Sequence, residues 1–82
     1  RQPLLPIAKG KNVYKVLSIG FGNTGTPMVT IESGRETVCY KLPYEYSEWA
    51  MTVVGCANMG EKLVPGEVVF SLENGKYYAD IL

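Results

Sequence analysis

The first half of the chain combines positively charged side chains with aromatic rings. This combination is typical of proteins that bind single-stranded nucleic acid, because flat rings stack on bases at roughly 1–3 kcal/mol each while lysine and arginine follow the phosphates. Tyrosine is also an ordinary half-buried strand residue, so a place in the core or on an ordinary surface is the alternative for these rings. The candidate nucleic-acid-binding residues are Lys9, Lys11, Tyr14, Lys15, Phe21, Arg35, Tyr40 and Lys41.

Catalytic and metal-binding chemistry has little support in the sequence. Histidine, the commonest general base near neutral pH and the commonest metal ligand, is absent. The serines and cysteines therefore have no histidine to activate them, and Glu45 and Glu48 have no companion base or metal ligands. Cys39 and Cys56 lack the short paired spacings of a zinc site. We expect no enzyme, no catalytic residue, no metal and no cofactor.

Residues 20–25, GFGNTG, match the glycine pattern G-x-G-x-x-G that opens dinucleotide-binding domains. That pattern needs a helix directly after the loop. Here Thr26-Pro27 leads into the β-rich run Met28–Ile31 instead. We therefore predict a flexible loop between two strands, whose backbone N–H groups are able to meet phosphate oxygens.

Charge is balanced overall but not along the chain. Residues 1–41 carry six basic and two acidic side chains, hence 6 − 2 = +4, and residues 42–82 carry two basic and six acidic ones, hence 2 − 6 = −4. This polarity fits an anionic partner on the basic side or head-to-tail self-association. A chance split is the alternative for a chain with only 8 + 8 charged side chains.

At 82 residues the chain is long enough for one small domain. Residues 1–12 contain two prolines and no periodicity, which predicts an extended N-terminal arm before a single domain over residues 13–82. Residues 13–19 are β-branched and aromatic and predict a strand. The alternating runs 28–32 and 37–42 predict a hairpin with its loop at 33–34 or at 34–35, and either loop puts Val29, Ile31, Val38 and Tyr40 on one face.

Asn74-Gly75 gives the clearest turn signal, because both residues accept the positive φ of a type I′ turn. With this loop Glu73 faces Lys76, and the pairs 72/77, 70/79 and 68/81 form an apolar face. The opposite face is mixed and mostly exposed. Val69 and Leu82 are its exposed hydrophobic residues, and they predict a homodimer.

The middle of the chain leaves alternatives open. Residues 49–54 predict a strand buried on both faces, in preference to one helical turn capped by Ser47 before a shorter strand. Residues 56–62 predict a connection or one turn of helix. Five or six strands without a long helix indicate an all-β fold, a small antiparallel barrel of the OB-like or SH3-like kind that closes on itself.

The segment Tyr44–Trp49 is aromatic and acidic. Tyrosine and tryptophan are favoured interface anchors, so the alternative function is a protein–protein interaction or assembly module that uses this segment or an edge strand. A plain loop with one ring packed inward is the structural alternative. No run of eighteen apolar residues is present, so we expect a soluble protein without a membrane partner. The two cysteines predict free thiols in an intracellular setting, or else one disulfide.

Residues 25–82 resemble, with gaps, the filamentous-phage single-stranded-DNA-binding proteins, which are small dimeric OB-type barrels. The resemblance rests on Gly25-Thr26-Pro27, Cys39-Tyr40 followed by Glu45-Tyr46, Pro65-Gly66 and the turn at Asn74-Gly75. In that family, basic and aromatic residues of a hairpin and a tyrosine of the following strand contact DNA, which implies such roles for Arg35 and Tyr40. Met28 stands where the family has an aromatic residue, and the hairpin is poorer in arginine. The resemblance also implies the host cytoplasm as location if a phage encodes the chain.

Overall fold

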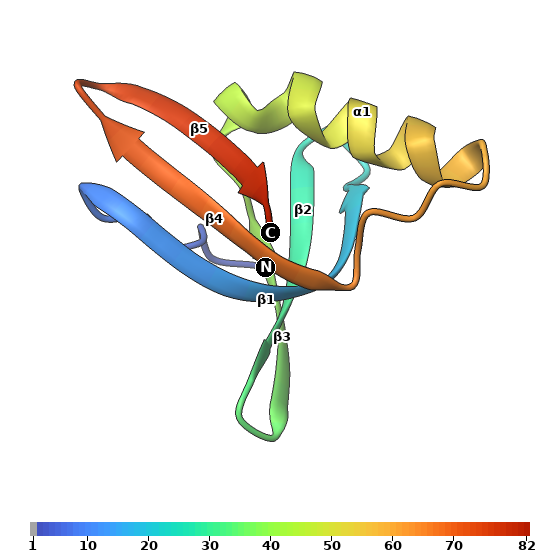
Figure 1. The fold of residues 1–82 in the computed structure, drawn as a ribbon, viewed down its shortest axis with the longest axis horizontal. Helices are drawn as coiled ribbons and strands as arrows, with labels where there is room; N and C mark the ends of the chain where they lie inside the picture. Colours follow the sequence, from blue (N-terminus) through green and yellow to red (C-terminus); the bar gives the residue numbers. More distant parts are fainter. Residues whose placement is uncertain (1) are drawn as a thin grey trace.

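β1 is the central strand of the five-stranded sheet. A computed structural model describes residues 2–82. In them the sheet has the order β3-β2-β1-β4-β5, with every neighbouring pair antiparallel (Figure 1). The elements are β1 Gly10–Phe21, β2 Pro27–Ser33, β3 Glu36–Lys41, the 3₁₀ turn η1 Tyr44–Tyr46, α1 Ser47–Asn58, β4 Gly66–Glu73 and β5 Lys76–Ile81.

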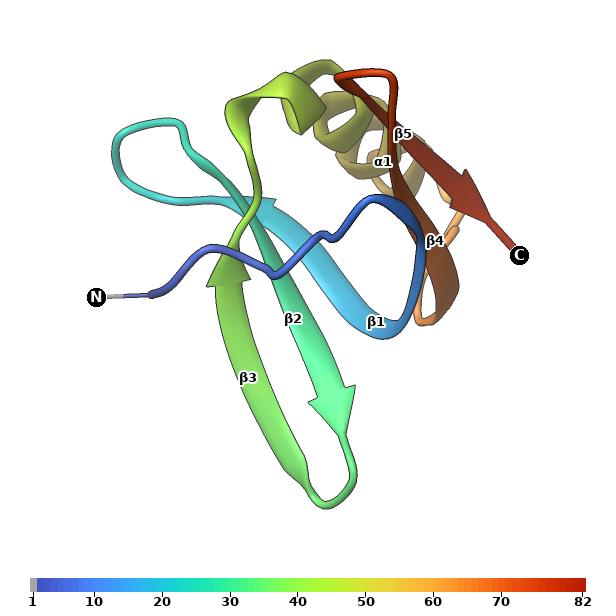
Figure 2. The ribbon, with the colours of Figure 1, turned by 90° about the vertical axis from the view of Figure 1, so that its left-hand side faces the viewer.

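The two halves of β1 pair with different strands. Residues 10–16 pair with β4, and residues 15–21 pair with β2. The register with β2 shifts between Val16 and Ser18, so Leu17 is the extra residue of a bulge. A bulge bends its strand and increases the local twist. The sheet therefore curls, and the β2–β3 hairpin projects from the rest of the molecule (Figures 1 and 2).

Both predicted hairpins are confirmed. Ser33 pairs with Glu36, which selects Gly34-Arg35 as the loop between β2 and β3. Glu73 pairs with Lys76, and Asn74 and Gly75 adopt φ values of 55° and 74°, as a type I′ turn requires. The first strand begins at Gly10 rather than at the predicted Val13, because its first residues pair with the end of β4.

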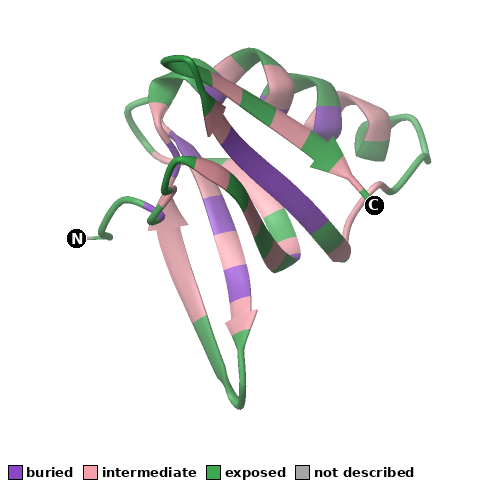
Figure 3. Ribbon diagram, turned by 60° about the vertical axis from the view of Figure 1, so that its left-hand side comes forward, coloured by how far each residue is buried: buried purple, intermediate pink, exposed green. Residues whose placement is uncertain are grey.

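The core lies on the concave side of the sheet, as the alternation of the strands predicts. Val29 and Ile31 are buried, and so are Val68 and Phe70 of β4 (Figure 3). One expectation is wrong: Val69, on the outer side of β4, is only 9% exposed. β4 lies between β1 and β5, so side chains of both neighbours shelter its outer side.

The strand predicted at 49–54 is wrong, because residues Ser47–Asn58 form a helix of 12 residues. Thr52, Val53 and Val54 favour a strand by local preference. The buried residues Tyr46, Ala50 and Val53 follow the helical spacing i, i+4, i+7, which places them on one helix face against the core. Tertiary packing therefore outweighs local preference here.

Helix α1 reaches Asn58, and residues 59–65 form a connection, which agrees with the prediction of a connection or one helical turn over residues 56–62. The helix ends in a Schellman motif, in which the Gly60 amide donates to the Ala57 carbonyl and the Glu61 amide donates to the Cys56 carbonyl. Gly60 has a φ of 89°, the left-handed conformation that this termination needs.

The sheet does not close, contrary to expectation: β3 and β5 remain its two edges. The N-terminal arm covers the open side, where Leu5 is buried and its amide donates to the Lys41 carbonyl (2.8 Å), while the Lys41 amide donates to Pro3 (2.8 Å) (Figure 2). Tyr46 covers it from η1 and donates its hydroxyl to the Tyr78 carbonyl (2.9 Å). The fold is a small, barrel-like all-β sheet, and its strand order, with a helix between β3 and β4, fits the OB alternative.

Within residues 2–82, no helix has the length and apolar character that crossing a bilayer would require.

Candidate nucleic-acid interface

The outer side of the curled sheet presents two faces that meet near Lys15. Successive side chains of a strand point to opposite sides, so register and alternation assign each residue to a face. We name the outer side of β2, β3 and the second half of β1 the hairpin face: Ser18, Gly20, Met28, Thr30, Glu32, Thr37, Cys39 and Lys41. We name the outer side of β4, β5 and the first half of β1 the C-terminal face: Lys11, Val13, Glu67, Val69, Ser71, Glu73, Lys76, Tyr78, Asp80 and Leu82.

The charge asymmetry of the sequence is only partly an asymmetry in space. Arg1 lies outside the described residues, and residues 2–41 carry 5 − 2 = +3, whereas residues 42–82, which include α1, β4 and β5, carry 2 − 6 = −4. The first half of β1 pairs with β4, so Lys11 lies on the C-terminal face beside acidic residues. The β2–β3 hairpin itself carries Arg35 and Lys41 against Glu32 and Glu36. An anionic polymer would therefore be drawn to the individual cations Arg35 and Lys41 and not to a uniformly positive side.

The hairpin face is an open polar surface with a cation at each end. Its middle has small side chains, Ser18 beside Thr30 and Thr30 beside Cys39. Arg35 lies in the exposed loop at the tip, and Lys41 lies at the base of β3. At a strand rise of about 3.3 Å per residue, the six steps from Arg35 to Lys41 span roughly 20 Å. Sequence analysis selected both residues as candidate phosphate contacts, and in the structure they lie along one hairpin.

Lys15 has acidic neighbours on both sides. Its Nζ atom lies 3.4 Å from Oε1 of Glu32, and its cross-strand partner on β4 is Glu67. These carboxylates offset much of its charge at this position. Lys15 is therefore a weaker phosphate ligand than the sequence implied.

Tyr14 and Tyr40 lie on the concave side of the sheet, opposite the lysines with which the sequence grouped them. Both rings pack against the core, and the Tyr14 hydroxyl donates to the Pro6 carbonyl. Burial, and secondarily the nearby Tyr40, raise the pKa of Tyr14 above its ordinary value. The Tyr14 ring also lies 6.2 Å from the ring of Phe70. In this arrangement both rings stabilise the fold instead of facing the strands' outer surface.

Phe21 lies at the base of the hairpin, at the end of β1 and opposite Pro27. The glycine loop that follows joins two strands, as predicted. Its Gly22 amide donates to the Thr26 carbonyl and its Gly25 amide donates to the Gly22 carbonyl. These two amides are therefore used within the loop. Phe21 is 39% exposed, but its pairing with Pro27 puts it on the side of Val29 and Ile31, opposite the hairpin face.

Tyr44 is the exposed ring that sequence reasoning did not assign to nucleic acid. It is 77% exposed at the start of η1, and it lines a hollow of about 400 Å³ together with Lys41. The signal was its position after Lys41 and Pro43, but only the turn at η1 decides which ring of this segment points outward. The hollow is lined by Leu4, Thr26, Lys41, Leu42, Pro43, Tyr44, Glu45 and Tyr77.

The other two rings of the acidic aromatic segment lie inward. Tyr46 is buried, and its ring lies 5.3 Å from that of Phe70, with Trp49 at 5.5 Å from the same ring. Burial, followed by Tyr77 and Glu45, raises the pKa of Tyr46 to about 12. Within this segment, Tyr44 is therefore the ring available to a partner.

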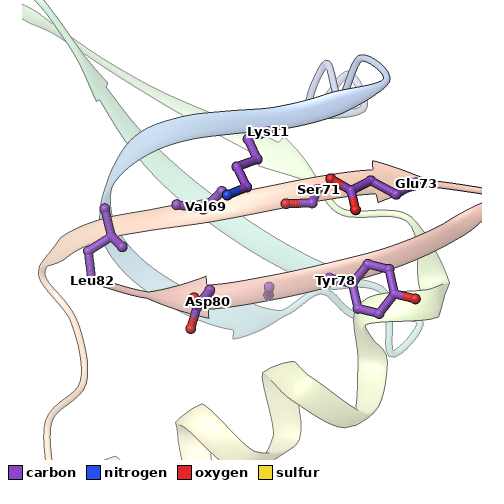
Figure 4. A pocket seen from close by; sticks show the side chains of 8 residues that line it. Lys11, Val69, Ser71, Glu73, Tyr78, Asp80 and Leu82 are labelled. Atoms are coloured by element: carbon purple, nitrogen blue, oxygen red, sulfur yellow. The ribbon is translucent and has the colours of Figure 1, made fainter.

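Lys9 and Lys11 lie away from the hairpin face. Lys9 is exposed on the arm before β1, and Lys11 lines a depression of about 430 Å³ on the C-terminal face (Figure 4). The same depression is lined by Glu73, Asp80 and Tyr78. Two carboxylates against one ammonium make this depression a poor phosphate site.

Both cysteines are free thiols and half-buried. Among residues 2–82, no three or more histidine, cysteine, aspartate or glutamate side chains are grouped so as to hold a metal ion.

No protein-family model, curated protein or solved structure matches this chain. The likeness to filamentous-phage single-stranded-DNA-binding proteins therefore stays a prediction from the sequence.

Proposed function

We propose that the protein binds single-stranded nucleic acid, without strong sequence preference and without catalysis, along the hairpin face. The observation that carries the proposal is the placement of Arg35 and Lys41 at the two ends of an open polar surface. Small side chains between them let a sugar–phosphate chain lie close to the strands. OB-folds bind oligonucleotides on the face of their second and third strands, which is an analogy in favour of the same surface.

Each residue at this surface has a distinct role. Arg35 and Lys41 contact phosphates, and Tyr44 beside Lys41 stacks on a base, whereas Phe21 lies on the side of the strands opposite the hairpin face. Lys15 adds little because of its two acidic neighbours. Tyr14 and Tyr40 support the strands from the concave side, and we assign Lys9 and Lys11 no direct contact.

The experiment that tests this function is a titration of a labelled single-stranded oligonucleotide, followed by fluorescence anisotropy at two salt concentrations. For single strands the logarithm of affinity falls with the logarithm of salt by about 0.7 per phosphate contact. The two contacts made by Arg35 and Lys41 therefore predict roughly 7-fold weaker binding at 200 mM than at 50 mM salt. Absence of micromolar binding at low salt would exclude the proposal.

A protein-interaction module is the second candidate, and the free edge of β5 favours it. β5 has a side without a neighbouring strand in the sheet, and an extended peptide is able to add to such an edge. The edge of β3 is already occupied in part, because the arm bonds to it at Lys41. Segment 44–49 supports this candidate less, because Tyr46 and Trp49 pack inward. Failure to bind oligonucleotides at low salt would move this candidate to first place.

Three further proposals accompany the function. Free thiols fit a reducing, intracellular compartment. A phage origin, with the host cytoplasm as location, rests on the resemblance of residues 25–82 alone. Homodimerisation through the C-terminal face is supported by Leu82 and Tyr78, which are 68% and 51% exposed.

A further inference from the structure

The hollow beside Tyr44 lies where segments from separate parts of the chain meet. Its walls come from the arm, the glycine loop, the end of β3, η1 and the start of β5. Backbone hydrogen bonds fix this frame: both backbone groups of Lys41 bond to the arm at 2.8 Å, and the Leu42 amide donates to Pro27 at 2.9 Å. The Tyr46 amide donates to the Pro43 carbonyl at 3.0 Å and holds η1.

The hollow brings together three kinds of chemistry. The ring of Tyr44 is open to solvent and takes part in none of the aromatic pairs found among residues 2–82. Lys41 supplies an ammonium group, and Glu45 supplies a carboxylate on the same lining. A carboxylate repels phosphate but accepts hydrogen bonds from an exocyclic amino group of a base, such as N4 of cytosine.

We propose that this hollow holds one nucleotide of the bound strand and prefers a base with an exocyclic amino group. The base lies against the ring of Tyr44 and donates from its amino group to the Glu45 carboxylate, while its phosphate meets Lys41. This proposal rests on the proposed function and adds base selectivity at one position. Cytosine, adenine and guanine satisfy Glu45, whereas thymine and uracil present a carbonyl oxygen to it.

The test compares labelled oligo(dC) and oligo(dT) of equal length on the full chain, with fluorescence anisotropy as the readout. We expect oligo(dC) to bind at least fivefold more tightly than oligo(dT). Glu45→Gln removes the carboxylate at nearly constant size, so we expect the preference to disappear. Tyr44→Ala weakens binding of both oligonucleotides by roughly tenfold, and Tyr44→Phe, which keeps the ring, retains wild-type affinity.

Tyr78→Ala is the matched control, because Tyr78 is also an exposed ring but lies on the C-terminal face. We expect it to bind both oligonucleotides like the wild type. Tyr44 and Glu45 are exposed, so their variants should fold, and thermal unfolding followed by circular dichroism verifies this. Salt-dependent binding that neither Tyr44→Ala nor Glu45→Gln changes would overturn the nucleotide site and leave the proposed function standing. No binding of either oligonucleotide by the wild type would overturn both.

Discussion

The hairpin face and the C-terminal face are outer sides of the same sheet and share β1, but they offer different chemistry. The hairpin face has small polar side chains between Arg35 and Lys41. The C-terminal face has exposed Val13, Tyr78 and Leu82 among alternating charges. The hairpin face suits a polyanion, whereas the C-terminal face suits a partner whose surface is apolar and carries charges of both signs.

The difference between the faces comes from the neighbours of each cation more than from the number of cations. Lys15 has Glu32 and Glu67 as cross-strand partners, and Lys76 pairs with Glu73. Lys41 pairs with Met28, so no carboxylate opposes it across the strands. Opposite charges on paired residues satisfy each other, which leaves Lys41 and the loop residue Arg35 available for a partner.

The largest effect is expected from removing the two cations of the hairpin face. Arg35→Ala with Lys41→Ala removes two charge-assisted phosphate contacts, each worth about tenfold in affinity, so binding of a single-stranded oligonucleotide weakens roughly 100-fold. The salt dependence becomes shallower by about 1.4 in the logarithmic slope. Anisotropy titrations at several salt concentrations measure both quantities.

The matched control is Lys11→Ala with Lys76→Ala, which removes the same charge from the C-terminal face. We expect this pair to retain nearly full affinity. Equal losses in the two double variants would show that overall charge, and not the geometry of one face, governs binding.

A smaller effect is expected on the C-terminal face, where we propose dimerisation. Leu82→Asp replaces an exposed apolar side chain with a carboxylate close to Glu67, whose carbonyl accepts from the Leu82 amide at 3.0 Å. The variant should weaken the dimer about tenfold and leave the affinity per protomer for nucleic acid unchanged. Sedimentation equilibrium over a range of protein concentrations measures the dissociation constant of the dimer. Identical monomer behaviour of variant and wild type would contradict a dimer at this face.

The elements that sequence analysis predicted well are those that depend on neighbours in the chain. Two-residue loops fix the register of a hairpin, so Gly34-Arg35 and Asn74-Gly75 specify four of the five strands. Sequence analysis did not predict helix α1. The helical spacing of Tyr46, Ala50 and Val53 indicates a buried helix face only once distant strands have formed the core that this face packs against. The β-branched residues of α1 favour a strand when taken locally.

Sequence analysis likewise predicted only part of the candidate site. Arg35 and Lys41 came to lie along one hairpin, because β2 and β3 are consecutive in the chain and neighbours in the sheet, whereas β1 carries Lys11 to the C-terminal face. Alternation along β1 puts Tyr14 on the side opposite Lys11 and Lys15, and grouping residues by closeness in sequence missed this. The exposure of Tyr44 depends on the η1 turn, which was not predicted, and on the arm, whose extended form was predicted but not the surface that it covers.

The smallest effect on stability is expected from changing Tyr46. Its side chain belongs to neither face and covers the open side of the sheet. Burial, Tyr77 and Glu45 raise its pKa to about 12 in the folded protein, whereas an unfolded chain releases this proton near pH 10. Between these values the unfolded state binds fewer protons, so the free energy of unfolding falls as pH rises, and the stabilisation is fully present below pH 10. Tyr46→Phe loses the hydrogen bond to Tyr78 and about 1 kcal/mol at neutral pH, but its stability should decline less steeply between pH 10 and 12. Urea unfolding across this range compares the two proteins, and parallel curves would mean that the Tyr46 proton is not held by the fold.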